Sequence, residues 1–468
     1  MTTASDLGMA PLALLPEILL VTGALVVLVL GSFLARHRQW AARLVALAAL
    51  LAAGLVACAT VFVGAPVTVF SGAVTVDGAT AAARVVIAVA TGLVIGLGAD
   101  EIAGDARESE SYTLLLLAAS GASVLAGASD LLVLAVGFLL TGIPTYALIG
   151  LARTRPAAEA ALKTYLLGAL SGVGLLLGAT VLFGLTAATS YAEVGQRLGT
   201  APLSALALGA VAVLAGLLFE AGAVPVHFWV PDAAQGSRII AAAFVTTVPK
   251  VGALVATYRF VAELPGTIAV ELLVGALAVA GMTLGNLTAL GQDDPRRLLG
   301  WSTVSQVGYL LVPVAVVGGA ELALPALLYY LAAYSVTNLA AFAVVAAVPA
   351  HRLDDHRGLA TSRPWLAAAL LVSMLGLLGT PPTAVFVGKL TAATAAWQGG
   401  APWLTVALLV NTVASLAYYL RWIAVACRPA GPAEHPPHER AQPRPSAAAV
   451  AVLAASVSVA LGVASGVA

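Results

Sequence analysis

The sequence predicts an all-α integral membrane protein with about 14 transmembrane helices. Hydrophobic residues make up 61% of the 468 residues and charged residues only 9%, whereas about 25% of the residues in a soluble domain are charged. The apolar residues fall into stretches that are each near the roughly 20 residues a spanning helix needs. These stretches lack the period of two that barrel strands show, which favours helices. The composition excludes a nucleic-acid-binding protein, a secreted disulfide scaffold and a disordered chain.

The apolar stretches follow one another closely along the whole chain. They are centred near residues 23, 51, 89, 119, 140, 172, 214, 250, 279, 308, 336, 380, 414 and 457. The first has no Lys or Arg before it, so we expect a retained helix and not a secretory signal peptide. The two cysteines, Cys58 and Cys427, lie in apolar stretches. We expect them to be small core side chains and not a redox or metal pair.

The arginines predict the orientation of the helices. If the N-terminus lies outside, Arg84, Arg197 and Arg259 are the only arginines in or near outside loops, and all others belong to cytoplasmic loops and their margins. Such an excess of positive charge marks the cytoplasmic side. Because the predicted number of helices is even, both termini are expected outside.

The three lysines, Lys163, Lys250 and Lys389, all lie within apolar stretches, and Glu220 is an acid deep in the seventh stretch. Burying a lysine at mid-membrane costs roughly 3 kcal/mol, and such residues usually mark ion or proton routes. Lysine also loses its proton on burial more readily than arginine does. We therefore expect these four residues to form a proton pathway. The alternatives are buried pairs that only fix helix packing and, for Lys163, a helix-end salt bridge with Glu159.

Two stretches contain prolines in their interior. Pro225 interrupts the seventh stretch, and Pro381 and Pro382 interrupt the twelfth. Broken helices at corresponding positions indicate inverted repeats around a transport site, although prolines can also kink helices for packing alone. The separation predicts two inverted five-helix repeats within a single membrane domain. We expect helices 1–3 in residues 1–98, helices 4–8 in 110–262, helices 9–13 in 267–427, and helix 14 in 446–468.

The remaining segments give no sign of a bound cofactor or metal. No Gly-rich phosphate loop follows a strand, and no cysteine cluster is present to hold iron–sulfur. His435 and His438 stand in a proline-rich loop, residues 428–445, which is weak support for a metal site, so none is expected. The acidic stretch at residues 99–111 is expected to be a solvated face.

Six runs of the sequence resemble one membrane-protein family. They are EAALKTYLLGALSG (159–172), PVHFWVPDAAQGS (225–237), TTVPKVGALVATYRF (246–260), RRLLGWSTVSQVGYLL (296–311), YYLAAYSVTNLAAFAVV (329–345) and GLLGTPPTAVFVGKL (376–390). In this order they resemble the antiporter-like subunit N of bacterial NADH-quinone oxidoreductase, or complex I, as a divergent member. The resemblance implies that Lys163, Lys250 and Lys389 match the lysines of the family's sixth, eighth and twelfth helices. It also suggests that His227 relays protons, although a hydrogen-bonded helix-end histidine is the alternative.

The chain departs from the family at three positions. Leu139 stands where the family has a fifth-helix glutamate, Glu220 where it has a seventh-helix lysine, and Gln306 where it has a tenth-helix histidine. One hypothesis is that the charge pair is rebuilt as Glu220 with Lys163 or Lys250. In the tenth helix, Ser302, Ser305, Gln306 and Tyr309 are candidates to line a channel. Their alternative role is packing between helices.

The resemblance implies a proton-translocating membrane subunit of an NADH:quinone oxidoreductase, which couples quinone reduction to proton transfer along buried lysines and Glu220. It implies that NADH, FMN, iron–sulfur clusters and quinone belong to the complex and not to this chain. The expected partners are the other membrane and peripheral subunits and the lipid bilayer, in the bacterial cytoplasmic (inner) membrane. Two alternatives remain: a subunit of a multi-subunit cation/proton antiporter, and a non-pumping structural paralogue.

Overall fold

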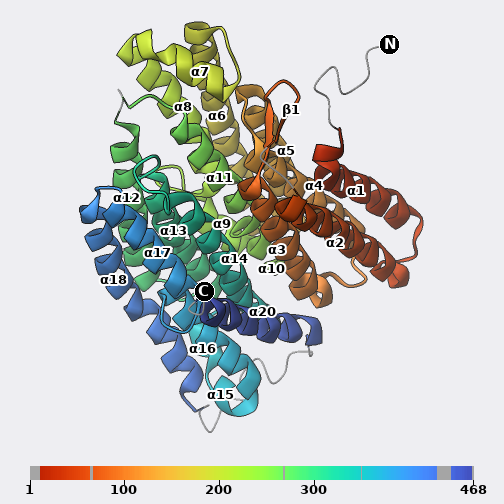
Figure 1. Ribbon diagram of the computed structural model, residues 1–468. Helices are drawn as coiled ribbons and strands as arrows, with labels where there is room; N and C mark the ends of the chain where they lie inside the picture. The colour runs from red at the N-terminus through yellow and green to blue at the C-terminus, as the bar shows by residue number, and fades with distance from the viewer. Residues whose placement is uncertain (1–10, 64–66, 267–268, 349, 430–443, 466–468) are drawn as a thin grey trace.

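The computed structural model describes residues 11–63, 67–266, 269–348, 350–429 and 444–465. Helices occupy most of these residues and pack side by side into one bundle (Figure 1). The only sheet in the described ranges is a hairpin of β1 (Val67–Val69) and β2 (Val74–Val76), in which Val67 pairs with Val76. The prediction of an all-α membrane fold is confirmed.

The long helices follow the predicted stretches in order. They are α1 (Leu15–Phe33), α2 (Trp40–Val63), α3 (Gly78–Ile102), α4 (Glu108–Gly127), α5 (Leu131–Gly150), α6 (Arg155–Thr186), α8 (Leu203–Ala221), α11 (Val248–Ala262), α12 (Val270–Leu290), α13 (Pro295–Val314), α14 (Ala323–Ala347), α16 (Pro364–Leu378), α17 (Ala384–Gln398), α18 (Pro402–Cys427) and α20 (Pro445–Ala464). The short helices are α7 (Tyr191–Arg197), α9 (Trp229–Gly236), α10 (Ile239–Val245) and α15 (Leu359–Ser362).

Twelve helical spans within these ranges are long and apolar enough to cross a membrane, with α10 and α11 counted as one span. The other two predicted crossings are of a different kind. Helix α13 carries a row of buried polar side chains, which makes it less apolar than its neighbours. The twelfth crossing is divided into α16 and α17, each of 15 residues.

Both predicted helix breaks are present. Helix α8 ends at Gly222, with φ +76°, and Pro225 follows before α9 begins. Helix α16 ends at Gly379, with φ +89°, and Pro381 and Pro382 follow before α17 begins. Glycine adopts this left-handed conformation without a Cβ clash, which explains why each half-helix stops at a glycine.

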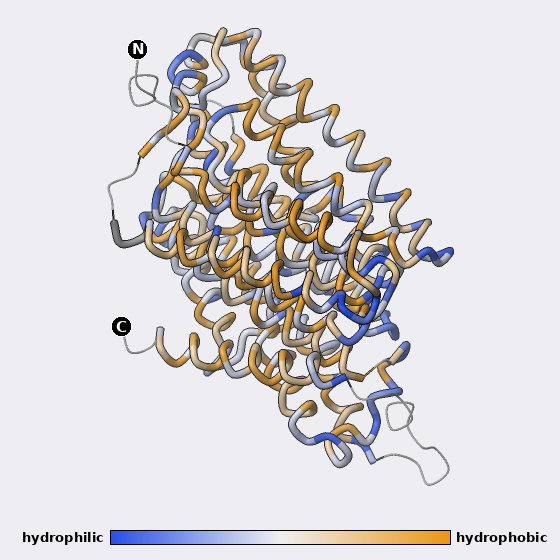
Figure 2. The backbone as a smooth tube through the Cα atoms, turned by 90° about the vertical axis from the view of Figure 1, so that its right-hand side faces the viewer, coloured by the Kyte–Doolittle hydropathy of each residue, from blue (hydrophilic) through white to orange (hydrophobic). Residues whose placement is uncertain are grey.

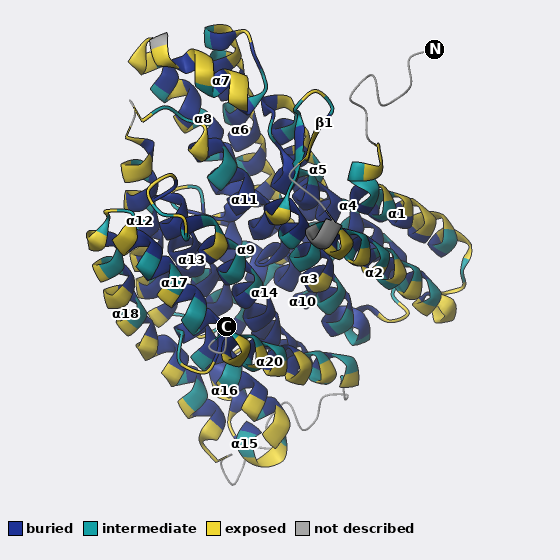
Figure 3. Ribbon diagram, in the orientation of Figure 1, coloured by how far each residue is buried: buried dark blue, intermediate teal, exposed yellow. Residues whose placement is uncertain are grey.

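The apolar surface of the bundle faces outward as well as inward. Exposed residues follow the outer sides of the peripheral helices, whereas the central helices are buried (Figure 3), and the outer helices are strongly hydrophobic (Figure 2). Four exposed tryptophans lie at helix ends, as in the aromatic belts of membrane proteins: Trp40, Trp365, Trp397 and Trp403.

The expectation that the two cysteines are core residues is wrong. Cys58 on α2 and Cys427 on α18 are both exposed on the outside of the bundle. A side chain in a bilayer can face lipid as favourably as it faces a protein core, because lipid tails are equally apolar. Hydrophobic neighbours in the sequence therefore do not show whether a cysteine faces lipid or the protein core.

One face of the bundle holds the α1–α2, α3–α4, α5–α6, α12–α13 and α14–α16 connections, together with most of the arginines; we call it the arginine-rich face. Hydrophilic loops gather along this side, and the described chain begins and ends on the opposite side (Figure 2). The β1–β2 hairpin, which joins α2 to α3, also lies on the opposite face.

The acidic stretch at residues 99–111 is more than a solvated face. Both carboxylate oxygens of Glu101 accept hydrogen bonds from the first backbone amides of α10, at 3.1 Å each. Asp105 forms an ion pair with Arg238 at 2.6 Å, and Asp100 accepts from the Ser446 amide at the start of α20, at 2.9 Å. These carboxylates stabilise helix N-termini from distant parts of the chain.

Candidate functional site

Lys250 lies in the first turn of α11 and is fully buried. Its Nζ donates a hydrogen bond of 3.1 Å to the carbonyl oxygen of Glu220, near the end of α8, and lies 4.5 Å from the centre of the Trp229 ring. The indole Nε1 of Trp229 donates to the adjacent carbonyl of Phe219 at 3.2 Å. One cation and one neutral donor therefore satisfy two of the last carbonyls of α8.

Lys389 repeats this arrangement at the second break. Its Nζ donates a hydrogen bond of 2.9 Å to the carbonyl oxygen of Leu378, the last residue of α16, and lies 4.0 Å from the centre of the Tyr309 ring. The amide Nε2 of Gln306 donates to the adjacent carbonyl of Leu377 at 2.8 Å. Gln306 is thus the neutral donor of this pair.

The two arrangements can hold a proton inside a bilayer. The C-terminal end of a helix carries partial negative charge, which favours a cation, and an aromatic face adds a cation–π attraction. Neither lysine forms an ion pair within 4 Å in the described part of the chain. A carbonyl stabilises the ammonium without neutralising it fully, so the amine can both take up and release a proton.

Two groups of hydrogen-bonding side chains lie between the two breaks. Tyr334 on α14 donates to the Thr246 carbonyl between α10 and α11 at 2.7 Å, and its hydroxyl oxygen lies 3.0 Å from Thr303 Oγ1 on α13. One turn further along α13, Gln306 accepts from Tyr330 at 2.7 Å and donates to the Leu377 carbonyl beside Lys389. All of these side chains are buried.

The predicted channel residues of α13 are in place but make direct contacts. Ser302 shares a hydrogen bond with Tyr419 at 2.6 Å, and Ser305 donates to Asn286 at 2.7 Å. Tyr309 packs against Lys389. Asn286 also bonds the Asn411 carbonyl at 2.9 Å. These residues are candidates to line a channel, and in the structure their side chains contact buried side chains of other helices.

Sequence reasoning missed several members of this buried polar cluster. Asn286, Asn338 and Asn411 each interrupt an apolar run, and they are the signal that could have identified α12, α14 and α18 as part of the site. The adjacent tyrosines Tyr418 and Tyr419 are a second such signal in the sequence. Both are fully buried in the structure.

Glu220 interacts with Lys250 and not with Lys163. The residue is buried at 2% exposure, and the group that Lys250 contacts is its backbone carbonyl and not its carboxylate. Lys163 pairs with Glu159 and Asp232 instead, and a charge pair of Glu220 with Lys250 stays a prediction. Leu139, at the position of the family's glutamate, is 44% exposed on the outer side of α5 and does not take part.

Lys163 does not lie on the buried axis, contrary to the expectation that all three lysines are buried. It stands two turns into α6 at the arginine-rich face, with its side chain 47% exposed. Its Nζ pairs with Glu159 at 2.6 Å and with Asp232 of α9 at 2.9 Å. Asp232 pairs in turn with Arg297 of α13 at 2.7 Å. A lysine near a helix end can reach the polar interface, and its position in an apolar run hides this.

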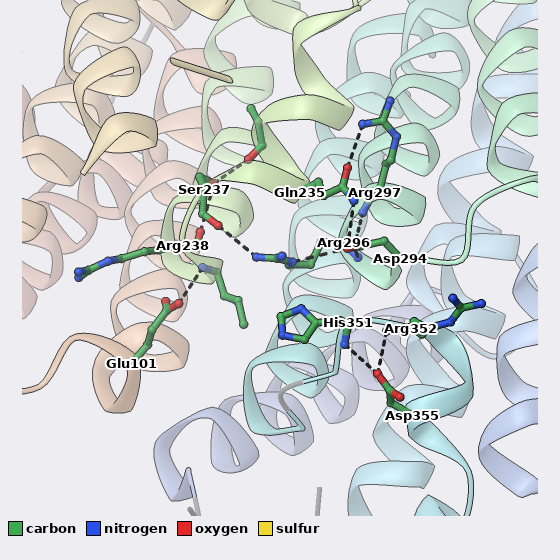
Figure 4. A network of polar contacts seen from close by, with 12 residues as sticks. Glu101, Gln235, Ser237, Arg238, Asp294, Arg296, Arg297, His351, Arg352 and Asp355 are labelled. Carbon is green, nitrogen blue, oxygen red and sulfur yellow. Dashed lines mark hydrogen bonds and ion pairs between the residues drawn. The ribbon is translucent and has the colours of Figure 1, made fainter. Parts of the chain in front are cut away.

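A larger polar network adjoins the Lys163 pairs at the arginine-rich face, and Figure 4 shows its part around Gln235, Asp294, Arg296 and Arg297. Gln235 accepts from Arg297 at 3.0 Å and donates to Asp294 at 3.2 Å, while Arg296 donates to the Ser237 carbonyl at 3.2 Å. A cavity of about 500 Å³ opens among these residues. The network ties α6, α9 and α13 together around the outer half of the first helix break.

His227 lies between the two halves of the first break and is 1% exposed. Its ring stacks 4.4 Å from Phe228 and 5.5 Å from Trp301, centre to centre. Neither ring nitrogen has a hydrogen-bond partner among the described side chains and backbone.

A buried ion pair outside the predicted site was not expected. Glu17 of α1 accepts two hydrogen bonds from Arg84 of α3, at 2.7 and 2.9 Å, and both side chains are at least 93% buried. Glu17 follows Pro16 in an apolar run, and Arg84 had been placed near an outside loop. The pair joins the N-terminal helices and lies apart from the two lysines. His435 and His438 lie outside the described residues.

Comparison with known proteins places these features in a family context. Residues 128–415 match the family described as NADH:quinone oxidoreductase/Mrp antiporter, TM. The chain is 54% identical to NADH-quinone oxidoreductase subunit N of Mycobacterium sp. (strain JLS), over 98% of this chain and 97% of the relative. It is 50% identical to subunit N 1 of Streptomyces griseus, over 98% and 96% of the two chains.

Solved structures agree with this result. A chain of respiratory complex I from Thermus thermophilus superposes with a TM-score of 0.83 and 31% identity, covering 96% of this chain and 97% of that one. A chain of the Mrp complex from Dietzia sp. also superposes with a TM-score of 0.83, covering 97% and 94%, but at 23% identity this likeness concerns the fold alone.

Proposed function

This chain belongs to the NADH:quinone oxidoreductase/Mrp antiporter family of transmembrane proteins, and from that premise we propose that it translocates protons as a membrane subunit of an NADH:quinone oxidoreductase. Its long match to subunit N relatives favours this function over that of an antiporter subunit. Those relatives are named as subunits of an enzyme, and we propose likewise that the enzyme activity belongs to the assembled complex. The partners are its other membrane and peripheral subunits.

The observation that carries the proposal is the pair of buried lysines at the two helix breaks. Each ammonium group contacts a carbonyl at the C-terminal end of a half-helix and the face of an aromatic ring. Broken helices of this kind provide cation sites near the middle of the bilayer in transporters. A purely structural subunit has no need of two buried amines, because each costs roughly 3 kcal/mol to bury.

We propose a route that enters at the arginine-rich face. Lys163 and the cavity beside Asp232 collect protons there, and His227 passes them inward to Glu220 and Lys250. The hydroxyl and amide groups of α13 and α14 connect Lys250 to Lys389 and include Ser302, Ser305, Gln306 and Tyr309. Because Ser305 and Tyr309 already have protein partners, transfer along this line requires some of these bonds to break and re-form.

The repeats and the orientation complete the proposal. Residues 110–262 and 267–427 form two inverted five-helix repeats with the breaks at Pro225 and at Pro381–Pro382, flanked by residues 1–98 and 446–468. The arginine-rich face lies toward the cytoplasm, since positive charge is retained on that side. Both termini then lie outside the bacterial cytoplasmic membrane.

The redox groups are assigned to other subunits. An iron–sulfur cluster needs four ligands, usually cysteines, whereas Cys58 and Cys427 stand singly on separate helices and face outward. The sequence also has no Gly-rich loop between a strand and a helix that would hold NADH or FMN. We infer that NADH, FMN, iron–sulfur clusters and quinone are bound elsewhere in the complex.

The test is complementation of a strain that lacks this chain. Inverted membrane vesicles are supplied with NADH, and quinone reduction and internal acidification are measured together. The wild-type chain should restore both. Lys250→Ala should restore assembly but not full acidification, whereas Arg38→Gln, an exposed charge remote from the route, should behave as wild type. Full acidification with Lys250→Ala, or no NADH-linked activity with the wild-type chain, would contradict the proposal.

A further inference from the structure

A cavity of about 390 Å³ at the arginine-rich face is not used by the proton route. It lies at the end of α18, next to the segment between α14 and α16. Four arginines line it, together with two aspartates: Arg352, Arg357, Arg421, Arg428, Asp293 and Asp354. The cavity therefore carries an excess of positive charge.

The arginines are only partly neutralised. Asp293 is shared by Arg352 at 3.6 Å and Arg421 at 4.0 Å, and Asp354 pairs with Arg357 at 3.0 Å. The side chain of Arg428 is exposed and has no ion pair or hydrogen bond in the part of the chain that the structure describes. The Nε of Arg421 is buried and likewise lacks an acceptor within these ranges. The exposed guanidinium group of Arg428 is therefore available for an anion.

The cavity stands where a lipid headgroup would be. Exposed apolar residues run along one side of α18 at helical spacing and include Val406, Val410, Val413 and Leu420. The same line continues through Ala424 to Arg428. Trp365, at the start of the neighbouring α16, is 77% exposed, which is typical of the membrane–water interface.

We propose that this cavity binds the phosphodiester headgroup of an anionic phospholipid, with its acyl chains lying along the exposed side of α18. Arg428 and Arg357 bind the phosphate oxygens, since a guanidinium group matches them with two donors. Arg421 is held in place by the Leu290 carbonyl at 3.0 Å and adds its positive charge to the lining of the cavity. The apolar strip favours a lipid over free phosphate, which would gain nothing from it. This binding site is independent of the proposed proton route.

The test measures lipid retention by the whole assembled complex. The complex is washed in detergent containing phosphatidylcholine and phosphatidylglycerol, and the bound lipids are counted by native mass spectrometry. Arg357→Gln with Arg428→Gln removes two charges without touching the Arg421 bonds. Because each arginine near an anionic surface contributes roughly a fivefold affinity, phosphatidylglycerol should bind about 25-fold more weakly. Arg36→Gln with Arg38→Gln removes two exposed charges from the same face and should have little effect.

Three results would overturn the proposal. Phosphatidylglycerol retention could be unchanged in the cavity variant, or the control variant could lose it equally. Inorganic phosphate at millimolar concentration could displace the lipid fully, which would show that the apolar strip adds nothing. If the double variant fails to assemble, Arg428→Gln alone keeps the test decisive, with an expected loss of roughly fivefold.

Discussion

Replacing Lys389 with methionine should impair proton pumping far more than it destabilises the protein. Methionine has a similar length and no charge, so the packing of α17 is largely kept. The loss of the bond to the Leu378 carbonyl costs about 1.5–3 kcal/mol, because the donor is charged. The loss of the contact with Tyr309 costs about 0.5–2 kcal/mol. Removing a buried charge from the bilayer returns about 2.5–3.5 kcal/mol. The net change in stability is therefore small.

Gln306→Leu is the matched comparison at the same break. It removes the neutral donor from the Leu377 carbonyl and leaves the Tyr330 hydroxyl without its acceptor, with nothing gained from charge burial. Leaving such buried groups unsatisfied costs roughly 1–3 kcal/mol each. Gln306→Leu should therefore lower the heat stability of the complex more than Lys389→Met does, and lower pumping less.

The assay compares the temperature at which the chain dissociates from the complex with NADH-driven acidification of inverted vesicles. Lys389→Met should lower acidification at least about tenfold, as expected for loss of a positioned proton carrier. The reasoning is refuted if Lys389→Met is the less stable of the two variants while each assembled complex still pumps normally. Lys389 would then be a cap for α16 and not a proton carrier.

Three further predictions follow from other contacts. Glu220→Gln should reduce acidification without changing assembly, because Lys250 bonds the backbone carbonyl of residue 220 and keeps that bond; unchanged pumping would exclude the carboxylate from the route. Glu17→Gln should destabilise the complex by about 3–5 kcal/mol, since it leaves Arg84 buried without its partner. The temperature of heat dissociation should recover when Glu17→Leu is combined with Arg84→Met. If the double variant lost as much heat stability as Glu17→Gln, the prediction would be contradicted. Burial raises the pKa of Asp105, but hydrogen bonds from the Arg107 amide and from Arg238 outweigh it and leave the pKa below its ordinary value. The stability that the Asp105 carboxylate contributes is therefore present at neutral pH and is lost only as the pH falls through that lowered pKa. Asp105→Asn should lower the dissociation temperature by the same small amount at mildly acidic and neutral pH, and a difference that vanished already at mildly acidic pH would refute the assignment.

Much of the fold could be predicted because the bilayer imposes a simple rule. A span needs a long apolar run, and prolines inside such a run can only be tolerated where other groups satisfy the backbone. The helix order and the breaks at Pro225 and Pro381 follow from this. The burial of Lys250 follows as well, because it stands at the middle of its run, whereas Lys389 is as far from the middle of its run as Lys163 is.

The rest depends on contacts between segments that are distant in the sequence. Lys163 looks as buried as the other lysines, but it is near enough to the start of α6 to reach Asp232 at the interface. That Trp229 and Gln306 complete the two lysine sites could not be predicted, because each contact joins different helices. The exposure of Cys427 was equally hidden, since lipid and protein interiors favour the same side chains.

The central claim is that Lys250 and Lys389 lie on one connected route. The most direct measurement is the number of protons moved per NADH oxidised for Lys250→Ala, Lys389→Ala and the double variant, in complexes matched for assembly. Residues on one route should be strongly non-additive. We expect each single variant to lower the ratio by the same amount and the double variant to lower it no further. Losses that add in the double variant, or a normal ratio in either single variant, would contradict the claim.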